Sequence, residues 1–271
     1  MLNPESGLRS PWVVDVKPFC IVDNVYYVGN KENAAHLIDT GDGLLLIDTP
    51  YASQGYLLLE SIRELGFDPH DIRWIVHSHG HIDHFGSTRL LVEKFSCRTY
   101  FPAVDMPLLN ERKELNWCDE LGLPFEPPYD TWFAPDVLMH PNDTFAFGNT
   151  TLTVYDAAGH TPGTMALFLS LPCGLTAAMH GGIGRNTLSA AYSHKYGLGD
   201  SWRVAYLRSM QALRDLKVDV VLGNHPYQAD VFGKLERRTL ADNPFIDANE
   251  WTQMVGRCIE KFHAMTQRDP L

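Results

Sequence analysis

The chain has 271 residues, of which 45% are hydrophobic and 20% charged, a composition typical of globular proteins. Its net charge of −11 disfavours nucleic acid and anionic lipid as main partners, because like charges repel. No apolar run approaches the roughly 20 residues needed to span a bilayer, so we expect no membrane association.

The N-terminal stretch and the cysteines both bear on the cellular compartment of the protein. The N-terminal stretch MLNPESGLRSPWVVDV lacks the charged start and apolar block of a secretory signal. The five cysteines are scattered, odd in number and without a CxxC pair: Cys20, Cys97, Cys118, Cys173 and Cys258. They predict neither a disulfide framework nor a cysteine zinc knuckle, so we expect a cytoplasmic protein.

The first part of the chain is rich in predicted strands. Thr-Gly-Asp-Gly at 40–43 supplies a hairpin turn between two of them. An apolar pattern of helical period, opened by Ser53 and closed by glycine, indicates the first helix. In chain order we predict strands over 19–29 and 33–49, a helix over 53–67, a strand over 73–78, a helix over 85–95 and a strand over 97–102.

Residues 103–135 break this rhythm with a possible helix and a Pro-rich connection. After them we predict strands within roughly 143–170 and over 175–182, a helix over 200–216, a strand and loop over 218–226, and a terminal helix over about 249–266. A strand-rich part followed by strand–helix units therefore occurs twice. We predict one domain over 1–271, with its core at about 19–226.

A cluster of histidines follows the strand that ends near His77. The stretch HSHGHIDHFG contains the pattern H-x-H-x-D-H, and neutral imidazole and carboxylate are standard zinc ligands. So many ligands on one turn cannot all reach one ion. We expect His79 and His81 to serve one ion, and Asp83 and His84 a second, while His77 packs inside the strand.

Two later histidines have a similar context. His160 in YDAAGHTPGT and His225 in VVLGNHPYQ each follow an apolar strand directly. Such strand-end loops are where α/β folds place their chemistry. Together with the loop HGHIDH they complete two sets of three ligands.

Three motifs resemble those of the metallo-β-lactamase superfamily: HSHGHIDHFG, LLLIDTP and AAGHTPGT. The resemblance runs from about residue 19 to 226. It implies an α/β (α+β) fold, an αββα sandwich of two mixed β-sheets with helices on the outer faces and metals at one edge.

The resemblance also implies a division of ligands. His79, His81 and His160 would hold one Zn²⁺, and Asp83, His84 and a later residue the other. Asp48, in LLLIDTP, matches the aspartate that supports such a site from behind its ligands.

One departure from the family pattern concerns the bridging aspartate that most of its hydrolases carry. The corresponding stretch, LTAAMHGGIG, has no acid, and His180 lies near that position. The third β-lactamase subclass also lacks the bridge and closes its second site with a histidine, for which His225 is the candidate. His180 is then a catalytic or substrate-facing residue, a packed histidine or a ligand.

The implied activity is that of a dinuclear zinc hydrolase, in which a metal-activated hydroxide attacks a cyclic amide or ester of β-lactam or lactone type. Asp83 would also orient the nucleophile and handle its proton. The substrate is a small molecule, and the sequence does not fix the oligomeric state. Candidate walls of the substrate pocket are Trp117, Trp132, Tyr192 and His194.

Other readings remain open at this point. The superfamily includes nucleases and phosphodiesterases, which the acidic charge and the missing bridge disfavour, and iron enzymes such as persulfide dioxygenases. Iron or manganese could therefore replace zinc. Flavodiiron proteins usually carry an acid in place of the second loop histidine, unlike His81. A non-enzymatic binding module would be expected to have lost ligands, and all six are present.

Overall fold

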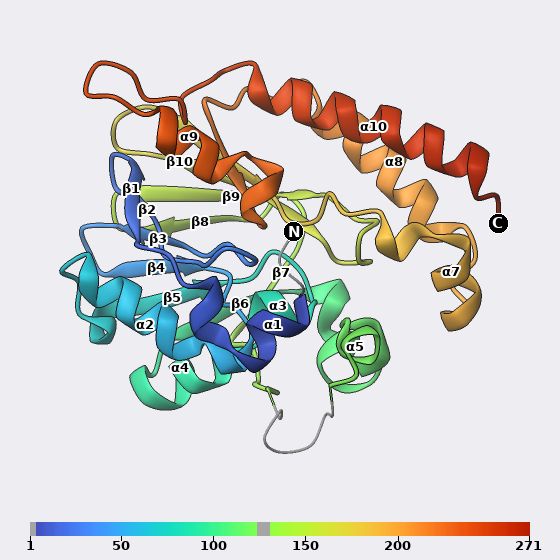
Figure 1. Ribbon diagram of the computed structural model, residues 1–271, viewed down its shortest axis with the longest axis horizontal. Coiled ribbons are helices and arrows are strands. Elements are labelled where there is room, and N and C mark those ends of the chain that lie inside the picture. Colours follow the sequence, from blue (N-terminus) through green and yellow to red (C-terminus); the bar gives the residue numbers. More distant parts are fainter. Residues whose placement is uncertain (1–3, 124–130) are drawn as a thin grey trace.

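Two β-sheets lie face to face with helices on both outer surfaces (Figure 1). The computed structural model describes residues 4–123 and 131–271. The predicted αββα sandwich is therefore confirmed.

The first sheet has seven strands in sequential order. They are β1 (Phe19–Val22), β2 (Val25–Tyr27), β3 (His36–Asp39), β4 (Leu44–Ile47), β5 (Ile72–Val76), β6 (Arg98–Pro102) and β7 (Val137–Met139). Strands β1 to β4 pair antiparallel, and β4 to β7 pair in parallel. The predicted turn at 40–43 joins β3 to β4, where Asp39 pairs with Leu44.

The second sheet has five strands in the order β12-β11-β10-β9-β8. They are β8 (Thr144–Phe147), β9 (Thr150–Asp156), β10 (Met165–Ser170), β11 (Thr176–His180) and β12 (Val220–Gly223). The first four pair antiparallel, whereas β12 joins β11 in parallel after a long helical crossover. Each sheet thus adds parallel strands after antiparallel ones, as the repeated sequence pattern indicated.

Helices cover the outer faces. The α-helices are α1 (Pro4–Arg9), α2 (Gly55–Glu64), α3 (Ile82–Phe85), α4 (Thr88–Phe95), α5 (Met106–Asn110), α6 (Cys118–Leu121), α7 (Ala190–Tyr196), α8 (Ser201–Leu213), α9 (Val231–Arg237) and α10 (Glu250–Arg268). Short 3₁₀ turns are η1 (Pro11–Val14), η2 (Ala52–Gln54), η3 (Pro69–Asp71), η4 (Ala103–Asp105), η5 (Lys113–Leu115), η6 (Asn186–Leu188) and η7 (Pro226–Gln228). Helices α2 and α4 lie against the first sheet, and α8 and α10 against the second (Figure 1).

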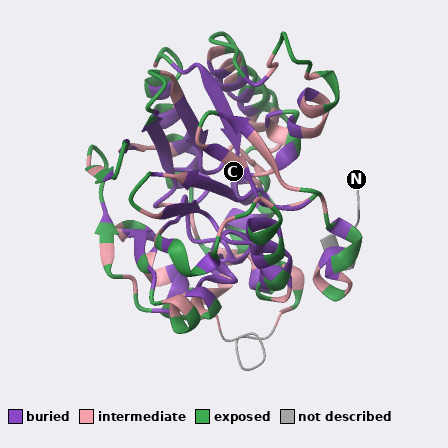
Figure 2. Cartoon of the chain, turned by 90° about the vertical axis from the view of Figure 1, so that its left-hand side faces the viewer, coloured by how far each residue is buried: buried purple, intermediate pink, exposed green. Residues whose placement is uncertain are grey.

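Side chains of β4 point alternately to the two faces of the first sheet, so this strand contacts both the core between the sheets and the outer helices. Leu45 and Ile47 point into the core between the sheets, while Leu44 and Leu46 pack under α2 and α4. A strand buried on both faces reads as a continuous apolar run, which is why LLLI carries no polar residue. Figure 2 shows the buried strands at the centre and the exposed surfaces of the helices around them.

Two element predictions need correction. The helix predicted over 85–95 is α4, which begins three residues later, and a separate short helix, α3, precedes it within the histidine loop. The chain turns between them at Gly86, where a Cβ atom would lie 2.8 Å from the Cα atom of Tyr51. The irregular segment 103–135 contains α5 and α6, while its residues 124–130 lie outside the described part. Strand β7, which follows that segment, was not predicted because it is only three residues long. Among the described helices, none is long and apolar enough to cross a membrane.

Candidate metal centre

The predicted ligands come together at one edge of the sandwich, from both sheets. The loop after β5 brings His79 to His84, the loop between β9 and β10 brings His160, and the turn after β12 brings His225. Their ligand atoms form two groups, and within each group these atoms lie within 4.8 Å of one another. We call them the three-histidine group (His79, His81 and His160) and the Asp83 group (Asp83, His84 and His225).

In the three-histidine group the ring centroids lie between 4.5 and 5.0 Å apart. Nδ1 of His79 donates to Oγ of Ser78 at 3.0 Å, and Nδ1 of His160 donates to the Gly184 carbonyl at 3.0 Å. Each of these bonds fixes the ring and leaves Nε2 as the acceptor nitrogen. Nε2 of His79 and of His81 is buried without a hydrogen-bond partner.

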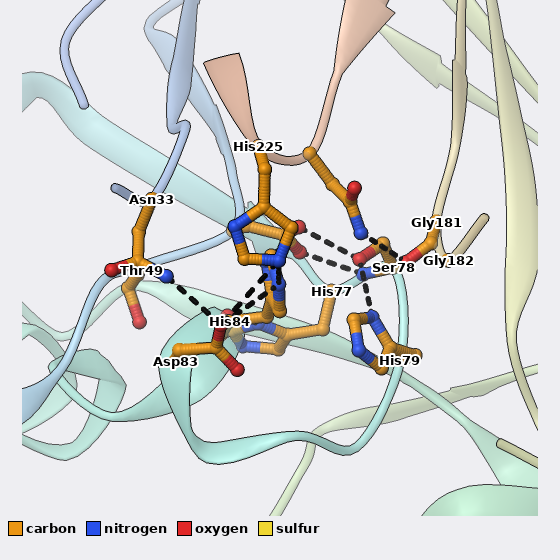
Figure 3. A network of polar contacts seen from close by, with 12 residues as sticks. Asn33, Thr49, His77, Ser78, His79, Asp83, His84, Gly181, Gly182 and His225 are labelled. Atoms are coloured by element: carbon orange, nitrogen blue, oxygen red, sulfur yellow. Dashed lines mark hydrogen bonds and ion pairs between the residues drawn. The ribbon is translucent and has the colours of Figure 1, made fainter. Parts of the chain in front are cut away.

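In the Asp83 group both histidine rings are also held through Nδ1. Nδ1 of His84 donates to Oδ2 of Asp48 at 3.0 Å, and Nδ1 of His225 donates to the Glu32 carbonyl at 2.8 Å. Their Nε2 atoms face each other at 3.4 Å, and Oδ2 of Asp83 lies 3.4 and 3.6 Å from them (Figure 3).

These contacts fit a metal ion. Since both imidazoles donate through Nδ1, each Nε2 carries a lone pair, and a carboxylate oxygen points at the same place. Three electron-rich atoms so close together repel one another unless a cation lies among them. The buried Nε2 atoms of the three-histidine group leave the same unmet requirement, because an unpaired buried polar atom is costly. Imidazole and carboxylate donors suit zinc, iron and manganese.

For most of the ligands the electrostatics favour the metal-binding protonation state; His84 differs, because Asp83 and Asp48 outweigh its burial and raise its pKa. Burial lowers the pKa of His79 and His81 well below the usual range and that of His160 to about 4. For Asp83, burial would raise the pKa, but His84 and His225 outweigh it and lower it. Neutral imidazole and ionised carboxylate are the forms that coordinate a metal.

Asp48, at the end of β4, hydrogen-bonds the loop after β5. Besides the bond to His84, its carboxylate accepts from the backbone N–H of Ser78 and from the Ser78 hydroxyl, both at 2.7 Å. Its own backbone has φ of +59°, a strained conformation for a non-glycine residue that tends to occur at functional sites. Asp48 thus aims one ligand, His84, and holds Ser78, which bonds a second, His79.

Two supporting residues were missed by the sequence reasoning. Asp105, fully buried at the end of η4, accepts from the Gly80 N–H at 2.8 Å, the Thr161 hydroxyl at 2.6 Å and the Gly163 N–H at 2.6 Å. It therefore ties the loop after β5 to the loop that carries His160. Asn33 donates through Nδ2 to Oδ2 of Asp83 at 2.9 Å (Figure 3).

A cavity of about 1010 Å³ opens over both groups. His81, Asp83, His160 and His225 line its floor, and Trp117 lines its wall, as predicted.

The other three pocket candidates are not among the described residues that line this cavity. Tyr192 is buried behind Trp117 and stacks on its ring, whereas Trp132 and His194 lie on the surface. By stacking on Trp117, Tyr192 holds that residue in the cavity wall without lining the cavity itself.

His180, predicted as a catalytic candidate, lies at the end of β11. Its side chain is buried, its ring lies 6.4 Å from that of Trp251, and its Nδ1 accepts from the Gly182 N–H at 3.2 Å. It neither joins a ligand group nor lines the cavity, within the described residues. Of the alternatives left open, the geometry favours a packed histidine.

His77 is likewise a packing residue, as interpreted from its place in the strand. It bonds the His84 carbonyl and the Thr88 hydroxyl and lies between Phe101 and Phe133.

Comparisons with known proteins agree with this geometry. The sequence model of the metallo-beta-lactamase superfamily matches residues 29–171, just over half of the chain. An uncharacterised protein of Aquifex aeolicus is 28% identical over 50% of this chain and 59% of its own length. The N-acyl homoserine lactonase AttM of Rhizobium radiobacter is 29% identical over 42% of each chain. The match therefore spans only about half the length of these relatives.

Among solved structures, BJP-1, a subclass B3 metallo-beta-lactamase of Bradyrhizobium japonicum, has the same fold. The TM-score is 0.83 at 24% identity, with 96% of this chain and 97% of that one covered.

Proposed function

Since the chain belongs to the metallo-beta-lactamase superfamily, we propose that it is a dinuclear zinc hydrolase that opens a cyclic amide or ester of lactone or β-lactam type. The observation that carries the proposal is the pair of ligand groups, whose acceptor atoms converge while each fixed imidazole donates elsewhere. The curated lactonase relative and the β-lactamase fold match support the same reaction class.

The residues divide the work. The three-histidine group would hold one zinc and the Asp83 group the other. When bound, a zinc pair supplies Lewis acidity towards a carbonyl and brings the pKa of water towards neutrality. Asp83, which receives the Asn33 amide on Oδ2, orients its carboxylate towards the cavity floor, where it can accept a proton.

The cavity sets the scale of the substrate. Its volume of about 1010 Å³ lies at the upper end of the range for small-molecule sites, roughly 300 to 1,000 Å³. Trp117 offers an apolar wall beside His81, with ring centroids 5.7 Å apart. The proposed substrate is thus a bicyclic β-lactam or a lactone with a side chain, bound by a protein that we place in the cytoplasm.

Metal analysis and a substrate panel test the proposal. Purified protein should contain about two zinc ions per chain and hydrolyse a chromogenic cephalosporin or members of a lactone series. One iron per chain would instead indicate a dioxygenase. Cleavage of a phosphodiester with no action on either ring class would refute the proposal.

A further inference from the structure

Three cations gather along one wall of the cavity. Arg257 and Lys261 lie one turn apart on α10, and Arg185 lies in the loop after β11; all three line the same cavity as the proposed ligands. They also lie close to one another around Cys258. Burial raises the pKa of its thiol, and the charges of Arg185, Lys261 and Arg257 all oppose that rise.

These cations have no ion-pair partner, whereas the neighbouring acids have one, although the charge of Arg257 also acts on Glu250. Within the described part of the chain, no carboxylate lies within ion-pair distance of them. The two acids on the same side of the cavity are already paired: Glu250 with Lys234 at 2.5 Å, and Asp230 with Arg237 at 2.8 Å. In a protein of net charge −11, three cations without an ion-pair partner on one cavity wall are a local exception. Arg257 and Lys261 are exposed, and Arg185 is half-buried.

The cations are held in a fixed relation to the proposed metal groups. The Gly184 carbonyl, directly before Arg185, accepts from Nδ1 of His160 at 3.0 Å. The Ile183 carbonyl accepts from the Tyr206 hydroxyl at 2.9 Å, which binds this loop to α8. One short loop therefore carries a cation and orients a ligand.

We propose that Arg185, Arg257 and Lys261 form a subsite for an anionic group, a carboxylate or phosphate, on the part of the substrate remote from the ring that is opened. This inference rests on the proposed function, and it adds the charge of the substrate. Guanidinium groups match such anions in geometry, and the half-buried Arg185 is the least screened of the three cations.

Matched substrates test the subsite. Three lactones with the same alkyl side chain, ending in a methyl, a carboxylate or a phosphate monoester, are assayed with the zinc-loaded wild type and with R257Q/K261Q. We expect kcat/KM for a charged lactone to fall about 10- to 100-fold in the variant, because a hydrogen bond to a charged group contributes at that level. The methyl lactone should change less than about threefold. Comparing the carboxylate with the phosphate identifies the anion.

R214Q/K217Q is the matched control, because it removes the same charge from exposed residues that do not line the cavity. It should leave all three substrates nearly unchanged. Added salt should reduce the advantage of the charged lactones in the wild type and not in R257Q/K261Q. Equal loss on all three lactones, or no loss on the charged ones, would overturn the subsite.

Direct binding separates this inference from the proposed function. The ring-opened products of the three lactones are titrated calorimetrically into the zinc-loaded proteins, so turnover is not needed. Each product carries the carboxylate formed at the opened ring, so the product of the methyl lactone controls for that charge. If no lactone is hydrolysed but the two products with a charged side chain bind about tenfold more weakly to R257Q/K261Q, and the methyl product binds equally to both proteins, the lactone part of the proposed function fails and the subsite stands. Unchanged product binding in the variant refutes the subsite even where hydrolysis is found.

Discussion

Individual side chains divide into those that would bind a metal and those that hold the ligands in place. Asp83 belongs to the first kind, since it is the sole carboxylate in the two groups. We predict that Asp83→Ala abolishes ring opening and lowers the zinc content from about two to about one per chain, because two imidazoles alone hold zinc weakly. Metal analysis and circular dichroism check this.

Asp230→Ala is the control, because it changes another acid of the cavity wall and should keep both ions. Full activity in Asp83→Ala would contradict the assignment.

Asp105 belongs to the second kind. Asp105→Asn replaces one acceptor oxygen by an NH2 group, which donates and so cannot accept from the donors on that side of the carboxylate. We expect zinc to bind the three-histidine group about 10- to 100-fold more weakly, as is typical when support behind a ligand is lost. Competition with a chromophoric chelator measures this without any assay of activity.

Asp136→Asn is the control for Asp105. Asp136 also accepts from a backbone N–H and a hydroxyl, both of Thr99, but lies outside the ligand loops. Asp105→Asn should lose about 1 to 3 kcal/mol of stability because Asp105 is buried, and the exposed Asp136 should lose less. Only Asp105→Asn should lose zinc affinity. Equal zinc binding by both variants would reduce Asp105 to a purely structural residue.

The difference between predicted and missed residues has a physical cause. His79, His81 and their neighbours are recognisable because ligand types recur at short spacing. Asp105 accepts hydrogen bonds from the backbone N–H groups of Gly80 and Gly163, which lie 25 and 58 residues away in the chain. Almost any residue type could provide such a backbone donor. No sequence pattern marks such a partner. Trp132 was predicted to line the pocket from its composition-biased segment, and only the fold shows it on the surface.

Among the elements, the loop between β9 and β10 is held by its packing on α8. Gly159 has φ of +140°, and a Cβ atom there would lie 2.4 Å from the Cα atom of Tyr206. We predict that Gly159→Ala displaces this loop, and His160 with it, costing about 2 to 4 kcal/mol of stability and weakening zinc binding. Denaturant unfolding and zinc titration measure the two effects.

Gly174→Ala is the control that separates backbone strain at positive φ from a steric clash with α8. Gly174 also has positive φ, +85°, but a Cβ atom there would meet nothing within 4 Å. Its variant should lose only about 1 kcal/mol and bind zinc normally. Similar zinc titrations for the two variants would show that the contact with α8 is unimportant.

The elements themselves were predictable to different degrees. Strand β4 and its hairpin turn follow from an apolar run and a Gly-rich turn. Helix α9 was missed, because VFGKLER is short and contains a central glycine. Helix α3 was also missed, because its four residues lie within the histidine loop, which was expected to be a turn.

For the molecule as a whole, metal binding should connect the two sheets, because each ligand group draws residues from both. We predict that removing the metal with a chelator lowers Tm by about 10 °C, given that a ligand at a thousand times its Kd adds about 4 kcal/mol to a fold of this size. Scanning calorimetry measures the shift. Added Zn²⁺ should restore Tm and added Mg²⁺ should not; an unchanged Tm after complete metal removal would contradict the prediction.

Acid stability should depend in part on His36, which lies in β3 away from the ligands. Burial lowers its pKa to about 4, against about 6.5 unfolded, so the unfolded chain binds the proton first as pH falls. Stability is therefore complete above pH 6.5 and decreases below it, by about 2 kcal/mol at pH 5. His36→Leu should lose less stability than the wild type between pH 7 and 5, as followed by urea unfolding.

The matching control is His263→Leu, which removes an exposed histidine. It should keep the acid sensitivity of the wild type. A His36→Leu protein with the same pH profile as the wild type would disprove the assignment.

The position of His225 in the chain has a consequence for biosynthesis. His84 and His225, whose rings meet in the finished fold, are separated by 141 residues. A nascent polypeptide that has emerged through β10 already contains every member of the three-histidine group, but it lacks the histidine that β12 delivers. A chain stalled or cut before β12 would therefore be equipped for one ion and never for the pair.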